Sequence, residues 1–315
     1  MRILFVKTSS LGDVVHNCPA VSDVRISHPG ATIDWVVEET FAGIVSMHSA
    51  IRKVIPVAVR RWRRSVIRPS VWNEMLTFKH SLRAERYDLI IDSQGLLKSA
   101  LIAALARGVR HGFDAASARE RVASRFYDVR HSVAHDLHAV ERSRHLTAKT
   151  LNLSRVGPCD YGLTSRCDAP LQMTGRYCVL LSMTSRTAKL WPEEHWVDLV
   201  KELDALGFIS VLPWGSETER LRCNRIASQA GTGVVPRALQ IEEVASLLTG
   251  SQAVVGLDSG LAHLAAALNI PTVGLFVGSN PRYTGLFGTG KLANLGGLGQ
   301  LPSVKCALEA LEEFL

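Results

Sequence analysis

The segment KTSSLGD, which ends at Asp13, places hydroxyl groups, a glycine and a carboxylate directly after the apolar run Ile3–Val6. Pro19 suits the first turn of a helix, so we expect Gly12–Asn17 to be a loop or an irregular first turn. Two interpretations of Asp13 stay open. It caps the helix that follows, or it acts as a general base on an acceptor hydroxyl. The absence of GxGxxG and GKS/GKT patterns argues against a nicotinamide enzyme or a P-loop NTPase.

A second candidate lies in VGLDSGLAHLAAAL, where the apolar run Ala253–Leu257 leads into Asp258, Ser259 and Gly260. A strand, a turn of small residues and a helix start together form an anion site, because backbone N–H groups and the helix dipole point at a phosphate. Gly260 lets the backbone approach the anion closely. The alternative is purely structural: Asp258 or Ser259 caps the helix and His263 packs on its first turn.

Two further segments follow expected strands in the second half of the chain. MTSRTAKLWPEEHW offers the hydroxyls of Thr184 and Ser185 and the cation of Lys189, groups that suit a diphosphate leaving group. LPWGSETE offers Trp214 and Glu219, which we expect to meet a nucleoside. For both segments the alternative is an ordinary solvated loop.

An arginine cluster surrounds Trp62 in AVRRWRRSVIRPS. Its members are Arg60, Arg61, Arg63, Arg64 and Arg68. Guanidinium groups bind phosphates and carboxylates in bidentate fashion. A solvated charge run and a nucleic-acid surface remain alternatives, although no recognised nucleic-acid-binding motif accompanies the cluster. His131, His135 and His138 have ligand-like spacing but no HExxH pattern or acidic partner, so we expect surface residues and no metal site.

Alternating apolar and amphipathic segments would position these residues. Expected strands are Ile3–Val6, Ile33–Val37, Val54–Val59, Leu89–Ile91, Tyr177–Leu181, Phe208–Leu212, Ala253–Leu257 and Thr272–Phe276. Expected helices are Glu74–Leu82, Leu96–Leu105, Glu193–Leu206, Glu219–Ala230, Ile241–Leu248, Leu261–Leu268 and Val304–Phe314. Continuous apolar strands predict parallel sheets covered on both faces.

The polar stretch Ser154–Gly175 separates two such series, which predicts an α/β chain of two doubly wound, Rossmann-like domains, 1–160 and 170–315. Ligands bind beyond the carboxyl ends of parallel strands, so the site should lie in a cleft across which the domains face each other. The Gly-rich stretch Gly285–Gly299 precedes the C-terminal helix, 304–314, and has no assigned role.

Charge is distributed unevenly over the 315 residues, whose formal net charge is +7. Residues 1–170 hold 25 Lys and Arg against 16 Asp and Glu, whereas residues 171–315 hold 11 against 13. The first half should therefore attract an anionic partner. No apolar run reaches the roughly 18 residues of a membrane span, and the N-terminus resembles no signal peptide, so we expect a cytoplasmic protein. Six scattered cysteines without a CxxC pair argue against zinc and disulfides.

Taken together, KTSSLGD, DWVVEE, VIPVAVRRWRR, DSQGLLKSA, KLWPEEHW, LPWG and DSGLAH resemble the bacterial lipopolysaccharide heptosyltransferases over essentially the whole chain. VIPVAVRRWRR together with KLWPEEHW resembles the members that add the first heptose. The resemblance implies a GT-B fold with an N-terminal acceptor domain and a C-terminal ADP-heptose domain. It also implies transfer of L-glycero-D-manno-heptose from ADP-heptose to a Kdo residue of Kdo-lipid A with inversion. Because the sequence shows no metal-ligand cluster, we expect no essential metal and no cofactor.

Because that acceptor is a membrane lipid, we expect a peripheral location on the cytoplasmic face of the inner membrane. Because no recognised nucleic-acid-binding motif is present, we expect no nucleic-acid partner. Two rival functions remain. One is a later-acting heptosyltransferase of the same family. The other is a non-catalytic binder of nucleic acid or other polyanions through the arginine cluster, which would bind them in a salt-dependent way and show no affinity for ADP.

Residue roles carry over from the family by position. Asp13 would be the catalytic base. Acceptor contacts would be Lys7, Ser10, Gly12, Arg60, Arg61, Arg63, Arg64, Lys98 and Arg119. Donor contacts would be Thr184, Ser185, Lys189, Trp214, Glu219, Leu239, Asp258, Ser259, Gly260 and His263. Within this set, Ser185 and Ser259 stand where threonine is familiar, and Leu239 stands where methionine is familiar, so hydroxyl chemistry and apolar volume are kept.

Overall fold

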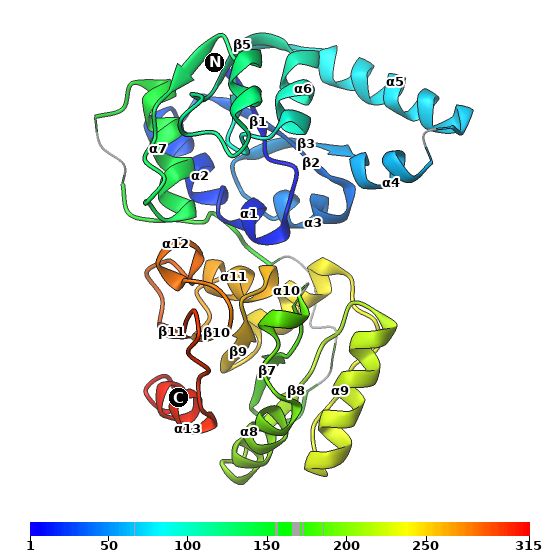
Figure 1. The fold of residues 1–315 in the computed structure, drawn as a ribbon, viewed down its shortest axis with the longest axis vertical. Helices are drawn as coiled ribbons and strands as arrows, with labels where there is room; N and C mark the ends of the chain where they lie inside the picture. The colour runs from blue at the N-terminus through cyan, green and yellow to red at the C-terminus, as the bar shows by residue number, and fades with distance from the viewer. Residues whose placement is uncertain (66, 155–156, 166–170, 172, 185) are drawn as a thin grey trace. The chain divides into compact units, whose positions relative to one another are not determined.

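The computed structural model describes residues 1–65, 67–154, 157–165, 171, 173–184 and 186–315 (Figure 1). The chain divides into two compact units, Met1–Leu163 (unit 1) and Thr164–Leu315 (unit 2). Each unit contains one sheet, and every strand pair in both sheets is parallel. Among the described residues, no helix is long and apolar enough to cross a membrane.

The sheet of unit 1 has the strand order β3-β2-β1-β4-β5-β6. Its strands are β1 (Arg2–Val6), β2 (Thr32–Glu38), β3 (Ile51–Val57), β4 (Arg86–Asp92), β5 (Arg107–Phe113) and β6 (Val129–His131). The chain order reverses at β1, which pairs with β2 on one side and β4 on the other. Loops diverge at such a switch point and leave room for a ligand. The loops after β1 and β4 are therefore the natural place for a site in this unit.

Helices cover this sheet on both sides. They are α1 (Leu11–Val15), α2 (Cys18–Ser27), α3 (Ala42–Ser46), α4 (Val59–Arg64), α5 (Pro69–Arg83), α6 (Leu97–Leu105) and α7 (Ala139–Leu151), with 3₁₀ turns at Glu39–Phe41 and Arg121–Phe126. Phe78 and Leu82 of α5 and Ile102 of α6 share one buried cluster with strand residues. Helix α2 packs against α7, and a buried pair joins them, since the Asp23 carboxylate accepts two 2.8 Å hydrogen bonds from Arg144.

Unit 2 has the strand order β11-β10-β9-β7-β8. The strands are β7 (Tyr177–Leu181), β8 (Ile209–Val211), β9 (Ala253–Leu257), β10 (Thr272–Phe276) and β11 (Leu292–Gly296). The helices are α8 (Glu193–Ala205), α9 (Glu217–Ala230), α10 (Ile241–Thr249), α11 (Gly260–Ala267), α12 (Pro281–Thr284) and α13 (Val304–Glu312), with a 3₁₀ turn at Thr187–Lys189. Trp191 and Trp196 are fully buried in its core, and the Trp191 indole N–H donates to the Pro302 carbonyl at 2.8 Å.

Two parallel, doubly wound sheets confirm the predicted fold class, but several local predictions were wrong. Of the two alternatives for Gly12–Asn17, the loop is wrong, because Leu11–Val15 forms the short helix α1, with a turn at 16–17 before α2. Pro19 does stand in the first turn of α2, as expected. Val59 does not end a strand. It begins α4, so the arginine cluster is partly helical.

Three further differences concern segments with weak patterns. β5 and β6 were not predicted, since Arg107–Phe113 mixes charged and apolar residues. The Gly-rich stretch contains β11, an added edge strand of unit 2. His138 is not a surface residue: it is 6% exposed, precedes α7 and lies edge-on to the buried His16 ring.

Candidate active site

Asp13 lies in α1, immediately beyond the loop that follows β1. The Ser10 N–H donates to Asp13 Oδ2 at 3.1 Å, and the Ser10 hydroxyl donates to the same oxygen at 3.2 Å. The N-cap residue of α1 is Ser10, and Asp13 stands three residues later, so Asp13 is not the N-cap that the structural interpretation expected. Its carboxylate nevertheless completes a capping box with Ser10. These contacts engage Oδ2 and leave Oδ1 available for a different partner.

That partner is Arg119, which follows β5 in the chain. Its two terminal nitrogens donate to Asp13 Oδ1 at 2.6 Å and to Oδ2 at 3.2 Å. Burial alone would raise the pKa of Asp13, but the charges of Lys7 and Arg119, together with hydrogen bonds from Arg119 and the Ser10 N–H, hold that pKa well below its ordinary value. The Asp13 side chain is still 16% exposed. Asp13 is therefore an ionised carboxylate that a ligand can reach.

Lys7 supports this charge from the end of β1. Its ammonium group is buried and donates to the Ser93 carbonyl at 2.8 Å. Burial lowers the pKa of Lys7 to about 8, with Asp13 opposing that shift. The structure thus places Lys7 beneath Asp13 as an electrostatic support.

The loops after β1 and β4 are tied together beside Asp13. The Gln94 side-chain oxygen accepts from the Thr8 N–H at 2.7 Å and from the Thr8 hydroxyl at 2.8 Å. Lys98, in the first turn of α6, donates to the Ser9 hydroxyl at 2.6 Å, and burial lowers its pKa. Lys7, Ser10, Gly12, Lys98 and Arg119, all predicted acceptor contacts, come together at this edge of the sheet.

Four members of the arginine cluster lie in α4, which follows β3, whereas Arg68 lies outside that helix and directly precedes α5. Arg61 forms ion pairs with Glu39 and Glu74, and Arg60 lies over the Phe41 ring at 5.3 Å. Arg63 and Arg64 are exposed. Their positions on the surface suit an anionic ligand, whereas a ligand that binds Arg61 must compete with two carboxylates.

Glu38 was not predicted as a site residue. It ends β2 with 1% of its surface exposed, and its Oε1 accepts from the Arg60 N–H at 2.9 Å. A buried carboxylate thereby fixes the start of α4, and its negative charge opposes the burial that lowers the pKa of Lys98. The position of Glu38 at the end of an apolar strand is the sequence feature that could have identified it as a site residue.

In unit 2, Asp258 follows β9 and gathers the predicted donor residues. Its carboxylate pairs with Lys189, lies 3.6 Å from His263 Nε2 and accepts from the Ser279 hydroxyl at 2.5 Å. The Thr184 hydroxyl donates to the Asp258 carbonyl at 3.0 Å. The loops after β7, β9 and β10 therefore converge on one carboxylate. Ser279 was not predicted, because nothing in its sequence context marks it.

This convergence sets the charge at the carboxyl edge of the unit 2 sheet. Burial works against the ionised form of Asp258, but hydrogen bonds from His263, Lys189 and Ser279 keep its pKa well below the ordinary range. Ser259 caps α11, accepting from the Ala262 N–H at 3.4 Å, so the structural interpretation of that turn is correct. The same turn sets the start of α11 beside the Lys189 cation, which is an arrangement suited to a diphosphate.

The expected nucleoside contacts lie on neighbouring loops of unit 2. The Trp214 indole N–H donates to the Pro236 carbonyl at 2.7 Å, which joins Trp214 to the loop that carries Leu239. The Glu219 carboxylate accepts from the Gly215 N–H at 2.7 Å and orders the turn before α9. Ser185 lies outside the described residues.

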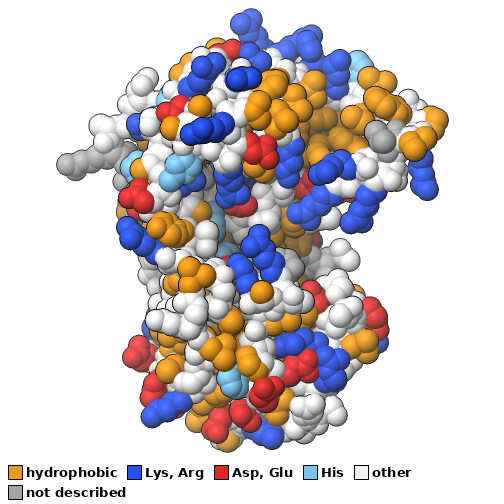
Figure 2. Space-filling view, viewed as in Figure 1, with side chains coloured by type: hydrophobic (Ala, Val, Ile, Leu, Met, Phe, Trp, Pro, Cys, Tyr) orange, Lys and Arg blue, Asp and Glu red, His pale blue; other side chains and the backbone are white. Residues whose placement is uncertain are grey.

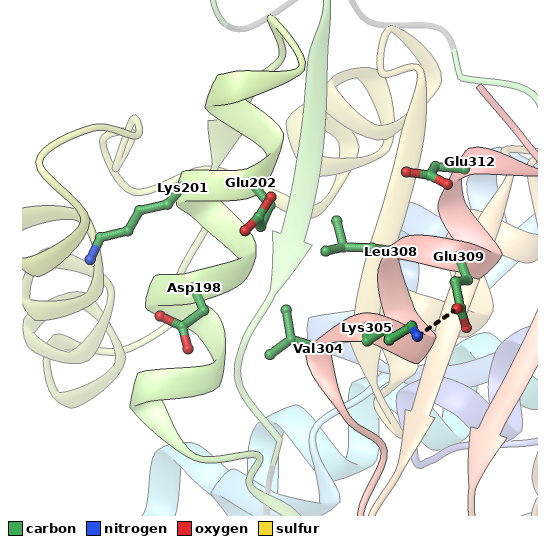
Figure 3. Close-up of a pocket in the computed structure, with 8 residues that line it drawn as sticks. All are labelled: Asp198, Lys201, Glu202, Val304, Lys305, Leu308, Glu309 and Glu312. Carbon is green, nitrogen blue, oxygen red and sulfur yellow. Dashed lines mark ion pairs between the residues drawn. The ribbon is translucent and has the colours of Figure 1, made fainter.

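A separate groove in unit 2 lies between α8 and α13 (Figure 3). Asp198 and Glu202 of α8 face Val304 and Leu308 of α13, and the groove has a volume of about 610 Å³. None of the predicted donor residues lines it, so it is not the donor site. In the described part of the chain, no cluster of three or more His, Cys, Asp or Glu side chains could hold a metal ion.

The two sites can now be compared with known proteins. The model of glycosyltransferase family 9 (heptosyltransferase) matches residues 75–311. The curated lipopolysaccharide heptosyltransferase 1 of Escherichia coli strain K12 is 44% identical over 296 residues, 93% of this chain and 92% of that protein. The chain belongs to glycosyltransferase family 9.

Solved structures agree with this family 9 assignment. The E. coli heptosyltransferase WaaC with ADP matches at 41% identity and a TM-score of 0.91, covering 100% of both chains. The same enzyme with ADP-2-deoxy-2-fluoro heptose matches at 41% identity and a TM-score of 0.87, covering 99% of both. The curated heptosyltransferase 2 of E. coli K12 is more distant, at 25% identity over 90% of this chain and 85% of that protein.

Proposed function

We propose that the protein transfers L-glycero-D-manno-heptose from ADP-heptose to a Kdo residue of Kdo-lipid A, with inversion at the anomeric carbon. The observation that carries this proposal is Asp13, an ionised and accessible carboxylate fixed at the switch point of the unit 1 sheet. An inverting transfer needs one such base near the attacking hydroxyl. The greater similarity to heptosyltransferase 1 than to heptosyltransferase 2 favours the first heptose over a later one.

The reaction proceeds as a single displacement. Asp13 takes the proton from an acceptor hydroxyl while that oxygen forms a bond to the anomeric carbon of the heptose. The bond between this carbon and the β-phosphate oxygen breaks, and ADP departs with the electron pair. Lys189 and the start of α11 stabilise the negative charge that grows on the diphosphate.

Lys189 must exchange its carboxylate partner for the diphosphate when the donor binds. Its present ion pair with Asp258 holds the ammonium group in place before that exchange. During this exchange Asp258 keeps its contacts with His263 and Ser279, which maintain the conformation of the turn between β9 and α11. In the proposed reaction these residues supply positive charge to the leaving group, and we propose that it uses no cofactor or metal.

The acceptor is anionic, and unit 1 offers cations for it beside Asp13. Arg63 and Arg64 are exposed on α4, and Lys98 and Arg119 border the base. Bidentate pairing of guanidinium groups with carboxylates and phosphates suits a Kdo-lipid A headgroup. We also infer a peripheral location on the cytoplasmic face of the inner membrane, because the acceptor is itself a membrane lipid.

Mass spectrometry of products from purified protein tests the proposal. ADP-heptose would be supplied with either Kdo-lipid A or a core that already carries one heptose. We expect one added heptose on Kdo-lipid A and none on the heptosylated core. Addition only to the heptosylated core would identify a later-acting enzyme. No transfer, together with no heat of ADP binding and tight salt-dependent RNA binding, would identify a polyanion binder.

A further inference from the structure

Helix α5 carries an exposed face that the proposed reaction does not use. Trp72 is 54% exposed and Leu76 is 51% exposed, although both are large apolar side chains. Lys79 and Arg83 follow them on the same side, because offsets of 4, 7 and 11 residues from Trp72 keep to one face of a helix. Val71, Phe78 and Leu82 of the same helix are buried instead. Core packing therefore accounts for one side of α5 and leaves the other to solvent.

The chain leading into α5 continues this surface. Ile67 is 92% exposed, and the exposed Arg68 lies next to it. We call Ile67, Arg68, Trp72, Leu76, Lys79 and Arg83 the α5 face. Figure 2 shows hydrophobic side chains gathered over the part of unit 1 that α5 and α6 occupy, with Lys and Arg side chains beside them. The α5 face is thus an apolar surface with a basic border.

Charge in this region is almost entirely positive. Between Ala58 and Arg83 the sequence holds seven Lys and Arg residues and one acidic residue, Glu74. Glu74 is itself engaged by Arg61 and by the Trp62 indole N–H, which donates to it at 2.8 Å. The α5 face therefore presents apolar groups within a field that attracts anions.

A bilayer surface that contains anionic lipids complements both the apolar side chains and the positive charges of the α5 face. Its headgroup boundary accepts an indole and aliphatic side chains, and its phosphates pair with Lys and Arg. RNA would satisfy the cations but leave Ile67 and Leu76 without apolar partners. We propose that the α5 face docks on an anionic bilayer, with Trp72 and Leu76 entering the headgroup boundary and Arg68, Lys79 and Arg83 lying at lipid phosphates.

This docking rests on the proposed function, because it would bring a lipid-bound acceptor to unit 1. Helix α6 packs against α5 and begins at Leu97, one residue before Lys98. Leu97 and Leu101 of α6 are 36% and 47% exposed. Helix α6 therefore adds exposed apolar side chains on an element that packs against α5 and whose Lys98 donates to the Ser9 hydroxyl in the loop before Asp13.

Sedimentation with vesicles tests the docking without any acceptor present. Vesicles of phosphatidylcholine with roughly 30% phosphatidylglycerol would be compared with phosphatidylcholine alone. We expect the wild-type protein to sediment with the anionic vesicles and to be released from them by high salt. It should not sediment with the neutral vesicles. The double variant Trp72→Ser/Leu76→Ser should bind the anionic vesicles about tenfold more weakly, because it loses most of the apolar contact.

Two controls keep the result specific. Leu221→Ser changes a leucine of α9 in unit 2 that is 49% exposed, and it should bind like the wild type. The double variant should keep wild-type transfer to an acceptor whose acyl chains have been removed, which separates loss of docking from misfolding and from failure of the proposed reaction. Equal vesicle binding by wild type and double variant would overturn the proposal. So would absence of vesicle binding in a protein that binds RNA.

Discussion

Arg119 holds both carboxylate oxygens of Asp13, at 2.6 Å and 3.2 Å, although the two residues are 106 positions apart in the chain. This pair fixes the direction of the carboxylate and keeps it ionised. It also raises a chemical question, since a strongly stabilised carboxylate is a weak base. If an anionic group of the acceptor paired with Arg119 in place of Asp13, the pKa of Asp13 would rise. Asp13 would then be a stronger base during heptose transfer.

Replacing Arg119 should therefore change the pH dependence of the reaction as well as its rate. In Arg119→Met the pKa of Asp13 should rise toward its ordinary value, since the adjacent positive charge is gone. Protonation would then remove the base at a higher pH, and the acid limb of the kcat/KM profile should move upward. We also expect kcat/KM near neutral pH to fall by about 10- to 100-fold, because the carboxylate loses its orientation. An acid limb identical to that of the wild type would contradict this role. Arg119→Lys, which keeps the charge, is the matched control.

Lys189 should matter for the donor alone. Lys189→Ala removes the cation at the start of α11, and we expect weaker ADP binding by about tenfold and a larger loss of kcat, since the leaving-group charge grows in the transition state. Calorimetric titration with ADP and steady-state kinetics measure the two effects. Lys201→Ala, on α8 in the groove of Figure 3, should leave both unchanged. Unaltered ADP affinity and rate in Lys189→Ala would remove Lys189 from the donor site.

His48 should make unit 1 sensitive to acid. Its ring is 2% exposed, lies 3.2 Å from the Cys18 carbonyl, and burial lowers the pKa of His48 from 6.5 to about 4. Between these values the unfolded chain binds more protons, so the stability that neutral His48 provides is lost as pH falls from 6.5 toward 4. The change amounts to at most about 3 kcal/mol. Denaturant unfolding at several pH values measures it. His48→Gln should be less stable at pH 7 with a flatter pH dependence, and an unchanged slope would contradict the assignment.

Sequence patterns grouped the candidate residues of unit 2 correctly because those residues are close together in the chain. Asp258, Ser259 and His263 stand within six consecutive residues, and the apolar strand before them marks a sheet edge. Ser279 escaped prediction because its contact with Asp258 depends on how β10 pairs with β9. That pairing is a long-range property of the sheet.

In unit 1 the sequence identified the candidate residues, but it did not predict which of them contact one another. Asp13, Lys7 and Lys98 were predicted as separate contacts, and the structure places them in one cluster. Their arrangement depends on the pairing of β1 with β4. Arg119 follows β5, and the charged residues of β5 prevented the prediction of that strand from the sequence. Glu38 was missed as a site residue because its role is to hold the start of α4.

Asp13→Ala tests the central claim most directly, through the single-turnover rate of heptose transfer and the calorimetric affinity for ADP. We expect a rate at least about 100-fold below that of the wild type, since general-base catalysis is lost, and an ADP affinity equal to that of the wild type. A variant that keeps more than about a tenth of the wild-type rate would show that Asp13 is not the base.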